Sequence, residues 1–548
     1  MKGGFLSVEA LVEGGPRGLP HAVERALWHL GFVDVRVVDG AGDEGADILA
    51  VREREQWVFQ CKWSGRRSVD RAGVDDIERA RTRYQADKAV LVTNTGLTRG
   101  AEDRRRALES IGIKISVWDG PTLAAIWERM PLRVPVQYSL RDYQSKAADA
   151  IRCDIAARGT ALLILATGLG KTVVGGEVIK NFLSKNTGAS VFVTAHTKEL
   201  VEQLERALWR HLDKTVPTHL ITGDTKPPAY DGVLVGTVES VLGVARTGWR
   251  PELIMIDETH HVGENGRFAE LLDLCRDAAQ FGVTATPWRG DKFDITNRFG
   301  APSFVMGIAE GMAAGYLSAV DYRLFVDNLD WDLVRSASEY SYSIKDLNKT
   351  LFLPQRDEEI IEQFRAVWRE TPDPRAILFC QTIEHAERIA ASLATSDHAW
   401  RHASFLHSGL PRQRRQVLLN EFRLGRVPVI TCVDVFNEGV DVPDVNLIGF
   451  LRVTHSRRIF VQQLGRGLRL SPGKQALKVL DFVTDIRRIA ATLELRRALE
   501  AAEHEHLSLS GSQIIFNDET AGSLLDHWIQ DAASLETAAD EVRLQFPE

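Results

Sequence analysis

A glycine-containing turn in the sequence has the residue types needed to hold a phosphate group. It consists of Thr167, Gly168, Leu169, Gly170, Lys171 and Thr172, between an apolar stretch and a helical pattern. Glycines let successive backbone N–H groups point at an anion, and the start of a helix adds its positive dipole end. Lys171 would reach the outer phosphates of a nucleotide, and Thr172 would offer its hydroxyl to Mg²⁺. Because Leu165 replaces the first glycine of the signature, a chance Gly-Lys-Thr remains the alternative at this point.

A pair of carboxylates follows the apolar run at residues 253–256. Such a run predicts a buried strand that ends in Asp257 and Glu258. Ligands bind at the carboxyl ends of strands in open α/β sheets. Asp257 would hold Mg²⁺ through water, and Glu258 would orient the water that attacks a phosphate. The alternative is an ordinary solvated loop, which rarely follows four apolar residues.

Two arginines three residues apart, Arg466 and Arg469, share one face of a predicted helix and can reach one anion. Their permanent charge suits the charge that develops on a transferred phosphoryl group. Because they lie far along the chain from the phosphate turn, a nucleotide bound between the two would close a cleft. An arginine-rich surface helix is the alternative.

A fourth group of candidate residues lies near the N-terminus, where Asp47 ends a glycine-rich acidic turn before one predicted strand and Lys62 lies on the next. If the hairpin turn centres on Arg54-Glu55, Asp47 faces Lys62, and strand alternation puts Gln60 on the same side as Lys62. Asp47 would ligate Mg²⁺, Gln60 would supply or orient a ligand, and Lys62 would stabilise the phosphorane in phosphodiester hydrolysis. By spacing alone, a plain Asp–Lys surface pair is equally well supported.

The elements that position the phosphate turn, the carboxylate pair and the arginine pair alternate between apolar strands and helical patterns. This alternation predicts parallel sheets with crossover helices. One series comprises residues 161–166, 191–195, 253–257 and 281–285, and a second comprises 376–380, 429–432, 447–451 and 478–482. An amphipathic helical pattern at residues 358–368 lies between them. The sequence therefore predicts an α/β protein with two such domains in tandem.

The composition indicates a soluble multidomain protein of 548 residues, without an apolar run long enough to span a bilayer. The N-terminus has no secretory pattern, so we expect a cytoplasmic location. The net charge of −8 matches the imbalance in residues 482–548, which hold 5 Arg or Lys against 13 Asp or Glu. Five singly placed cysteines predict reduced thiols and no structural zinc. Any affinity for nucleic acid must come from local basic faces.

The ordered motifs between Tyr138 and Thr484 resemble those of superfamily 2 helicases, nearest to the XPB-like and restriction-subunit branch with a DEAH-type box. The box here reads Asp-Glu-Thr-His. The resemblance implies that the phosphate turn and Asp257 bind ATP with Mg²⁺, that Arg141 and Gln144 read the adenine, and that Gly439 and Asp441 serve the sugar-side and coupling positions. It also implies a set of nucleic-acid contacts, at Thr194, His196, Gly236, Thr237, Gln381, Thr382, His407 and Thr431.

Residues 23–123 resemble Mrr-type restriction endonucleases of the PD-(D/E)xK fold, because the glycine-acid turn, Gln60-Cys61-Lys62 and the later strands and helices come in that family's order. The resemblance implies catalytic roles for Asp47, Gln60 and Lys62. The family's first helix usually carries an acid about three turns before the glycine. That place falls near Leu19-Pro20 here, and Glu24, one turn later, is the candidate substitute.

Together the two resemblances predict six segments: an endonuclease-like domain (1–130), a linker (131–139), an ATP-binding RecA-like domain (140–320), a connector (321–370), a second RecA-like domain (371–487) and an acidic helical tail (488–548). We expect an ATP-dependent DNA motor coupled to a nuclease that uses Mg²⁺ or Mn²⁺. Duplex DNA, a role in restriction or genome defence, and partner subunits follow from the resemblance. Two alternatives stay open: a repair or remodelling motor whose nuclease-like domain only binds DNA, and an RNA helicase.

Overall fold

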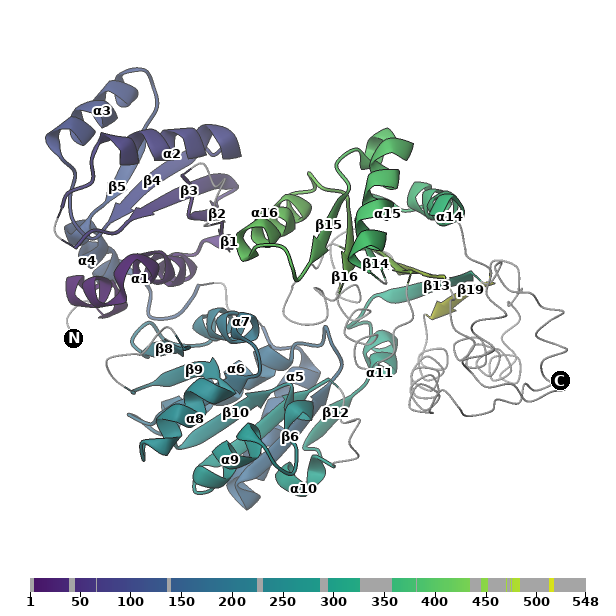
Figure 1. The fold of residues 1–548 in the computed structure, drawn as a ribbon. Coiled ribbons are helices and arrows are strands. Elements are labelled where there is room, and N and C mark those ends of the chain that lie inside the picture. Colours follow the sequence, from purple (N-terminus) through teal and green to yellow (C-terminus); the bar gives the residue numbers. More distant parts are fainter. Residues whose placement is uncertain are drawn as a thin grey trace, which may run out of the picture.

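The computed structural model describes residues 4–38, 45–65, 67–135, 139–223, 230–285, 294–325, 357–380, 382–433, 445–451, 470, 474, 476–482 and 512–516. Three β-sheets with helices packed on them follow one another along the chain (Figure 1), and we call these units the N-terminal, central and C-terminal domains. The α/β class predicted from the sequence is confirmed.

The N-terminal domain is built on a mixed sheet in the order β1-β2-β3-β4-β5. The first three strands pair antiparallel and the last three parallel. Helices α1 and α4 cover one face and α2 and α3 the other, so alternate strand side chains enter two separate apolar cores. The elements are α1 (Val8–His29), β1 (Val33–Val37), β2 (Ile48–Arg52), β3 (Glu55–Lys62), α2 (Arg71–Tyr84), β4 (Lys88–Thr93), α3 (Arg99–Ser110), β5 (Ile115–Trp118) and α4 (Gly120–Arg129).

Helix α1 is two helical pieces joined at a kink. It starts where the Ser7 side chain accepts a hydrogen bond from the backbone of Ala10. Gly15 adopts φ 64°, which lies outside the helical region, and Pro16 follows it. Proline fits the first turn of a new helix, because its missing N–H needs no partner there. The kink lets the second piece take a direction different from the first.

The central domain is a seven-stranded parallel sheet in the order β12-β6-β11-β10-β7-β9-β8. The strands are β6 (Thr160–Leu165), β7 (Val191–Ala195), β8 (Thr218–Ile221), β9 (Val233–Thr237), β10 (Leu253–Asp257), β11 (Ala279–Thr284) and β12 (Phe304–Met306). The helices are α5 (Asp142–Arg158), α6 (Lys171–Lys185), α7 (Lys198–Trp209), α8 (Val238–Arg246), α9 (Arg267–Leu274), α10 (Thr296–Phe299) and α11 (Ile308–Ala313). Strands β6 and β10 thus deliver the phosphate turn and the carboxylate pair to the same sheet edge.

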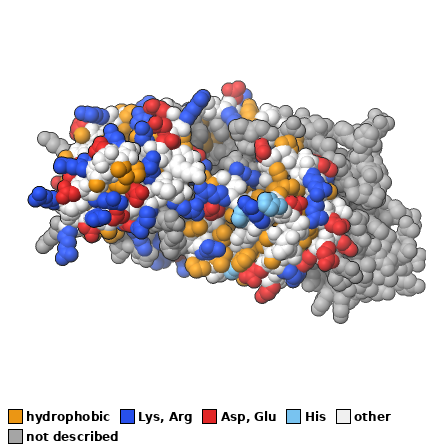
Figure 2. Space-filling view, turned by 90° about the horizontal axis from the view of Figure 1, so that it is seen from above, with side chains coloured by type: hydrophobic (Ala, Val, Ile, Leu, Met, Phe, Trp, Pro, Cys, Tyr) orange, Lys and Arg blue, Asp and Glu red, His pale blue; other side chains and the backbone are white. Residues whose placement is uncertain are grey.

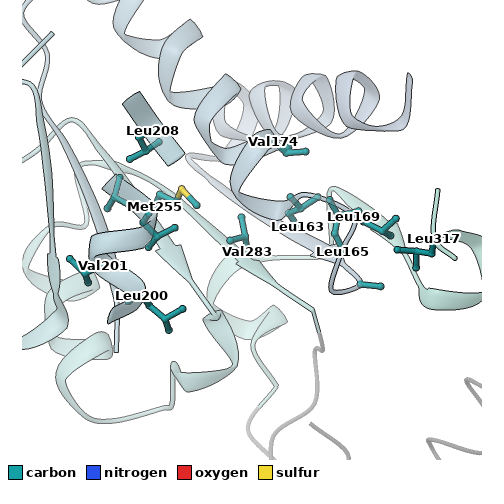
Figure 3. Packing of buried hydrophobic residues seen from close by; sticks show 14 of the residues in the cluster. Leu163, Leu165, Leu169, Val174, Leu200, Val201, Leu208, Met255, Val283 and Leu317 are labelled. Carbon is teal, nitrogen blue, oxygen red and sulfur yellow. The ribbon is translucent and has the colours of Figure 1, made fainter. Parts of the chain in front are cut away.

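Close packing holds α6 against this sheet. Figure 3 shows Met255 of β10 among Leu163, Val283, Leu208 and other buried side chains. A Cβ atom at Gly175 of α6 would lie 2.6 Å from the methyl carbon of Met255, so only glycine allows this approach. The helix that begins with Lys171 is therefore fixed over the strand that ends in Asp257.

The C-terminal domain has a seven-stranded sheet in the order β15-β16-β14-β17-β18-β13-β19. All pairs are parallel except β13 with β19. The elements are β13 (Ala319–Phe325), α14 (Asp357–Arg369), β14 (Ala376–Cys380), α15 (Ile383–Ser396), β15 (Ser404–His407), α16 (Arg412–Arg423), β16 (Val429–Val433), β17 (Leu447–Leu451), β18 (Ala476–Phe482) and β19 (Ser512–Phe516). The amphipathic helix expected at residues 358–368 is α14.

Two expectations for this region need correction. Most of β13 falls in the segment predicted to be a connector, yet it joins the sheet beside β18. Its neighbour β19 comes from the tail, which the sequence predicted to be helical. Backbone pairing with strands distant in the sequence decides both cases, and local propensity does not report it.

Candidate functional site

The phosphate turn has the backbone shape that its glycines predict. Gly168 and Gly170 have φ angles of 94° and 85°, in a region that favours glycine, and α6 starts immediately afterwards at Lys171. A Cβ atom at Gly170 would also lie 2.7 Å from Nε2 of Gln144, so a side chain there would displace that amide. The hydroxyl of Thr167 is buried and has no hydrogen-bond partner among the described residues. The turn can thus present its backbone N–H groups to an anion.

The residues predicted to read the base are tied to the turn. The Gln144 side chain donates to the carbonyl of Leu169 at 3.0 Å, and the Tyr143 hydroxyl donates to the same oxygen at 2.7 Å. The Arg141 guanidinium donates to the carbonyl of Tyr316, and the tyrosine rings 143 and 316 pack with centroids 4.5 Å apart. A base recognised by Arg141 and Gln144 would therefore be sensed directly by the phosphate turn.

The carboxylate pair lies at the end of β10, against the lysine of the turn. Nζ of Lys171 is 3.7 Å from Oε1 of Glu258, and both side chains are largely buried. Burial, together with the adjacent charge of Glu258, raises the pKa of Asp257 to about 7. A bound cation would stabilise the ionised form of a buried acid that lies next to a second acid. These two residues therefore fit the predicted Mg²⁺. Glu258 itself has φ 51°, an uncommon conformation that a non-glycine residue adopts mainly at functional sites.

The threonine of the Asp-Glu-Thr-His box is accommodated by a glycine on the next strand. A Cβ atom at Gly282 of β11 would lie 2.6 Å from the Thr259 side chain, and the Thr259 hydroxyl donates to the carbonyl of Val283 at 2.9 Å. The following His260 lies 3.1 Å from the hydroxyl of Thr284 and 3.3 Å from the Glu258 carboxylate. The box is thus hydrogen-bonded to β11, the neighbouring strand of the sheet.

A stack of histidines joins this box to a predicted nucleic-acid motif. The rings of His196 and His261 have centroids 3.8 Å apart, and those of His260 and His261 are 4.5 Å apart. His196 follows the end of β7, one of the predicted contact positions. Sequence reasoning did not single out His261, although its place directly after the box was a signal that could have found it.

The other predicted nucleic-acid contacts differ in exposure. Thr237 is partly exposed at the start of α8 and hydrogen-bonds Ser240. Gly236 is buried, and a Cβ atom there would lie 2.7 Å from the carbonyl of Ile221. Thr194 is fully buried within β7. The predicted direct contact needs correction for Thr194, since a side chain inside the sheet presents no surface to a strand of nucleic acid.

Three predicted contacts in the C-terminal domain are described. Thr382 is exposed and caps α15, and His407 ends β15 with its ring stacked on Phe405. Thr431 is fully buried and donates to the carbonyl of Ala386 at 2.7 Å, so its predicted direct contact also needs correction. The remaining predictions for this domain lie outside the described residues: Gln381, Gly439, Asp441, Arg466 and Arg469.

The acidic turn and hairpin of the N-terminal domain bring Asp47 and Gln60 together. Ile48 pairs with Phe59, which places Asp47 opposite Gln60 instead of Lys62, so the predicted register was wrong by two residues. Gln60 donates from Nε2 to Oδ2 of Asp47 at 3.0 Å, and the backbone N–H of Cys61 donates to the same oxygen. Oε1 of Gln60 is buried without a hydrogen-bond partner among the described residues. An acceptor of this kind beside a carboxylate fits a divalent metal.

Lys62 has a partner that the sequence did not indicate. Its Nζ lies 2.8 Å from Oδ2 of Asp76 on α2, and Arg79 donates to the other oxygen of the same carboxylate. Burial by itself would raise the pKa of Asp76, but the hydrogen bonds from Lys62 and Arg79 hold it below its usual value. Asp76 therefore belongs to the candidate site, next to the lysine predicted to be catalytic.

Glu24, the candidate substitute for the family's first acid, is bound elsewhere. Its carboxylate lies 3.0 Å from Nε of Arg206 on α7 of the central domain, and it is 3% exposed. This ion pair crosses the boundary between two domains. Its geometry favours a structural role for Glu24 over the predicted metal-binding one.

On the face seen from above (Figure 2), the charged side chains of the N-terminal domain are of both signs. Seen from above (Figure 2), Lys and Arg side chains over the N-terminal domain alternate with Asp and Glu. Several form ion pairs, such as Arg104 with Asp75 and Arg105 with Glu102. Within the described ranges there is neither a cluster of three His, Cys, Asp or Glu side chains arranged for a metal nor a helix long and apolar enough to cross a membrane.

Comparison with known families divides the chain into three matched regions. Residues 12–127 match the family described as “Restriction endonuclease”, of the Mrr catalytic type. Residues 137–289 match “Type III restriction enzyme, res subunit”, and residues 356–471 match “Helicase conserved C-terminal domain”. The chain therefore carries an Mrr-type restriction endonuclease domain followed by the two domains of a superfamily 2 helicase. The central and C-terminal domains are accordingly the two motor domains, and the N-terminal domain is the nuclease domain.

Several relatives of this helicase–nuclease chain are known. A “51.5 kDa protein” of a Lactococcus phage is 28% identical over 58% of this chain and 64% of its own length. The “Type I restriction enzyme EcoAI endonuclease subunit” of Escherichia coli is 25% identical over 67% of this chain and 49% of its own. The “DNA 3'-5' translocase XPB2” of Sulfurisphaera tokodaii is 25% identical over 63% of this chain and 81% of its own length. The chain thus spans less than two thirds of the length of the phage and E. coli relatives.

Among solved structures, “ATP-dependent Type ISP restriction-modification enzyme LlaBIII bound to DNA” has a TM-score of 0.50 and 16% identity. The similarity covers 87% of this chain and 37% of that one. At this identity the likeness supports the fold alone.

Proposed function

We propose that this chain is an ATP-dependent DNA translocase or helicase coupled to a metal-dependent DNA endonuclease that acts in restriction or genome defence. The observation that carries the proposal is the presence, in one chain, of the Lys171–Glu258 pair at a phosphate turn and of Asp47 bound to Gln60 near Lys62. The first set suits phosphoryl transfer from ATP and the second suits phosphodiester hydrolysis.

In the motor, the chain's own residues mainly bind the phosphates of ATP and orient the attacking water. The turn would hold the phosphates, Lys171 would neutralise their charge, and Glu258 would orient the attacking water. Thr172 and Asp257 would hold Mg²⁺, which when bound neutralises charge on the transferred phosphoryl group. Arg466 and Arg469 would approach from the other motor domain. Their predicted effect is a larger loss of turnover than of ATP affinity on replacement by alanine.

In the nuclease, Asp47 and Gln60 would hold Mg²⁺ or Mn²⁺, which polarises the phosphate when bound. Lys62 would stabilise negative charge on the phosphate oxygens during cleavage. We place the protein in the cytoplasm, acting on duplex DNA, with partner subunits of a defence system completing the enzyme.

A second candidate is a repair or remodelling motor whose nuclease domain only binds DNA. The Lys62–Asp76 pair favours it, because a lysine neutralised by a carboxylate gives less stabilisation to a phosphate. Glu24 favours it too, since its carboxylate is engaged by Arg206.

One set of assays tests both candidates. The purified chain is incubated with methylated and unmethylated duplex DNA, with Mg²⁺ or Mn²⁺, and with or without ATP. We expect cleavage that disappears in Lys62→Ala and Asp47→Ala, while DNA-stimulated ATP hydrolysis continues. If the wild-type protein leaves every substrate intact, the binding-only candidate replaces the first. Stimulation of ATP hydrolysis by RNA but not by DNA would contradict both.

A further inference from the structure

The second half of α1 lies against α7 of the first motor domain, and two ion pairs join them. His21 contacts Glu205 with 2.8 Å between Nε2 and Oε2, and Glu24 contacts Arg206 at 3.0 Å. Glu24 is 3% exposed and Glu205 is 1% exposed. Burial alone would lower the pKa of His21, but Glu205 raises it above its usual value, which favours the charged imidazole. The contact therefore contains charged groups that are buried together with their partners.

Arg25 extends this contact to the loop after α7. Its guanidinium donates to the carbonyl of Val216 at 2.8 Å, to that of Asp213 at 3.4 Å and to the hydroxyl of Thr218 at 3.1 Å. The side chain is 3% exposed, although it belongs to a residue type that is rarely buried unless it is paired. These partners all belong to the motor, so the buried position of Arg25 depends on the two domains staying together.

A second group of contacts joins the end of α4 to the same loop. Nζ of Lys214 donates to the carbonyls of Trp127 and Met130 at 2.6 Å and 2.7 Å, where a helix C-terminus attracts a positive charge. Arg133 of the linker donates to Asp213 at 2.9 Å, and the Arg210 guanidinium lies 3.9 Å from the centre of the Trp28 ring. The nuclease domain thus contacts the motor through two helices and the linker.

Both sides of this interface lead directly to a candidate site. On the nuclease side, the indole N–H of Trp63 donates to the carbonyl of Leu11 at 2.9 Å, which joins the first piece of α1 to the strand that carries Lys62. On the motor side, α7 follows β7 and His196, a predicted nucleic-acid contact. Packed helices and strands therefore connect the two sites through the described residues.

We propose that the α1–α7 interface makes the nuclease domain and the first motor domain one rigid body, so that the nuclease site keeps a fixed position relative to the nucleic-acid motif at His196. Movement of the motor domains on ATP binding then carries the nuclease with the first domain and changes its position only relative to the second. The cleavage activity of the N-terminal domain rests on the proposed function, whereas the rigid body does not. Cleavage would occur at a fixed offset from the DNA held by the first motor domain.

Hydrogen exchange of the full chain tests the rigid body without requiring cleavage. Amides of residues 21–28 and 213–218 are measured in the free protein and with duplex DNA plus a non-hydrolysable ATP analogue. We expect their protection to stay within about twofold between the two states, because a packed interface that does not open shields its amides equally in both. A large loss of protection on adding both ligands would overturn the proposal, because it would show that the domains separate.

Charge reversal tests whether the ion pair holds the interface. Glu24→Arg and Arg206→Glu each leave a buried like-charge contact, and we expect each to increase exchange in residues 213–218 by at least about tenfold, since breaking a buried pair is strongly destabilising. The double variant, which restores opposite charges, should recover most of the protection. Glu13→Arg is the matched control, because Glu13 is exposed on the same helix. If single and double variants exchange alike, the pair does not hold the interface.

Milder variants keep the test valid if a charge reversal prevents folding. Glu24→Gln and Arg206→Gln remove charge without repulsion, and both should raise exchange in residues 213–218 but not in the distant α15. Unchanged exchange in both would contradict the proposal. Absence of any DNA cleavage, with protection behaving as expected, would refute the nuclease assignment and leave the rigid body standing.

Discussion

Nζ of Lys171 lies 3.7 Å from the Glu258 carboxylate, so two charged groups of the candidate ATP site face each other. Both side chains are largely buried, which positions the lysine to bind phosphate and the glutamate to bind water. A γ-phosphate would enter between them and replace this ion pair with contacts to Lys171. Their separation thus marks the place where the chemistry of the motor is expected.

Replacing Lys171 with alanine should reduce ATP hydrolysis by at least about 100-fold, because the charge on the outer phosphates loses its main partner in the chain. The fold should survive, as measured by circular dichroism. Lys180→Ala is the matched control, since Lys180 lies on the same helix and pairs only with Glu177 at the surface. Equal turnover in the two variants would contradict the ATP site.

Glu258→Gln should bind ATP without hydrolysing it, because the amide keeps the shape of the side chain but cannot orient water as the carboxylate does. The expected sign is intact ATP retained through gel filtration of the purified variant. Asp257→Asn, in contrast, should weaken binding itself by removing the predicted Mg²⁺ contact. Free release of ATP from Glu258→Gln would assign the carboxylate another role.

The sequence predicted where the turn, the helix that follows it and the strand ending in the carboxylates lie, because each is encoded in a few consecutive residues. The nuclease hairpin was harder. Its turn lies at Glu53 and Arg54, which both have positive φ angles of 55° and 69°, whereas such turns usually contain asparagine or glycine. Without that signal, centring the turn one residue too late shifted the predicted partner of Asp47.

Asp76→Asn should change DNA cleavage, because Asp76 is the residue that holds the Lys62 ammonium group. If Asp76 positions Lys62 for catalysis, the variant should cut at least about tenfold more slowly, with a smaller change in DNA affinity. Asp75→Asn is the control, since that neighbour pairs with Arg104 instead. A faster-cutting Asp76→Asn would mean that the carboxylate restrains the lysine, and an unchanged rate would remove Asp76 from the site.

The partners of Glu24 and Lys62 could not be predicted from the sequence, because Arg206 and Asp76 look like ordinary exposed charges on amphipathic helices. Only the docking of α7 against α1, and of α2 against β3, makes them specific. Pairings of this kind depend on tertiary packing between distant segments, and no spacing within one element reports them.

Replacing His261 with alanine should reduce the stimulation of ATP hydrolysis by DNA. Its ring lies between His196, a predicted DNA contact, and His260, which is 3.3 Å from the Glu258 carboxylate. Hydrolysis without DNA should change less than the stimulated rate, because the residues of the phosphate turn are not altered. His219→Ala serves as control, since His219 pairs with Asp231 away from the stack. The same stimulation in both variants would exclude a coupling role.

Acid should destabilise the nuclease domain through His29, the last residue of α1. This side chain is fully buried, and burial together with the nearby charge of Arg25 lowers its pKa to about 4 from the ordinary 6.5. Below pH 6.5 the unfolded chain binds a proton that the folded chain does not, so the free energy of unfolding falls as the pH drops towards 4. For one such group the slope is about 1.4 kcal/mol per pH unit.

His29→Phe, which does not titrate, should therefore lose stability less steeply between pH 6.5 and 4 when urea denaturation is followed by circular dichroism. His21→Gln should act at higher pH instead: the raised pKa of His21 gives stability that is fully present below pH 6.5 and lost as the pH rises through the folded value, so this variant should lose less stability than the wild type above pH 6.5. Parallel curves for wild type and His29→Phe would show that His29 is protonated in the folded protein.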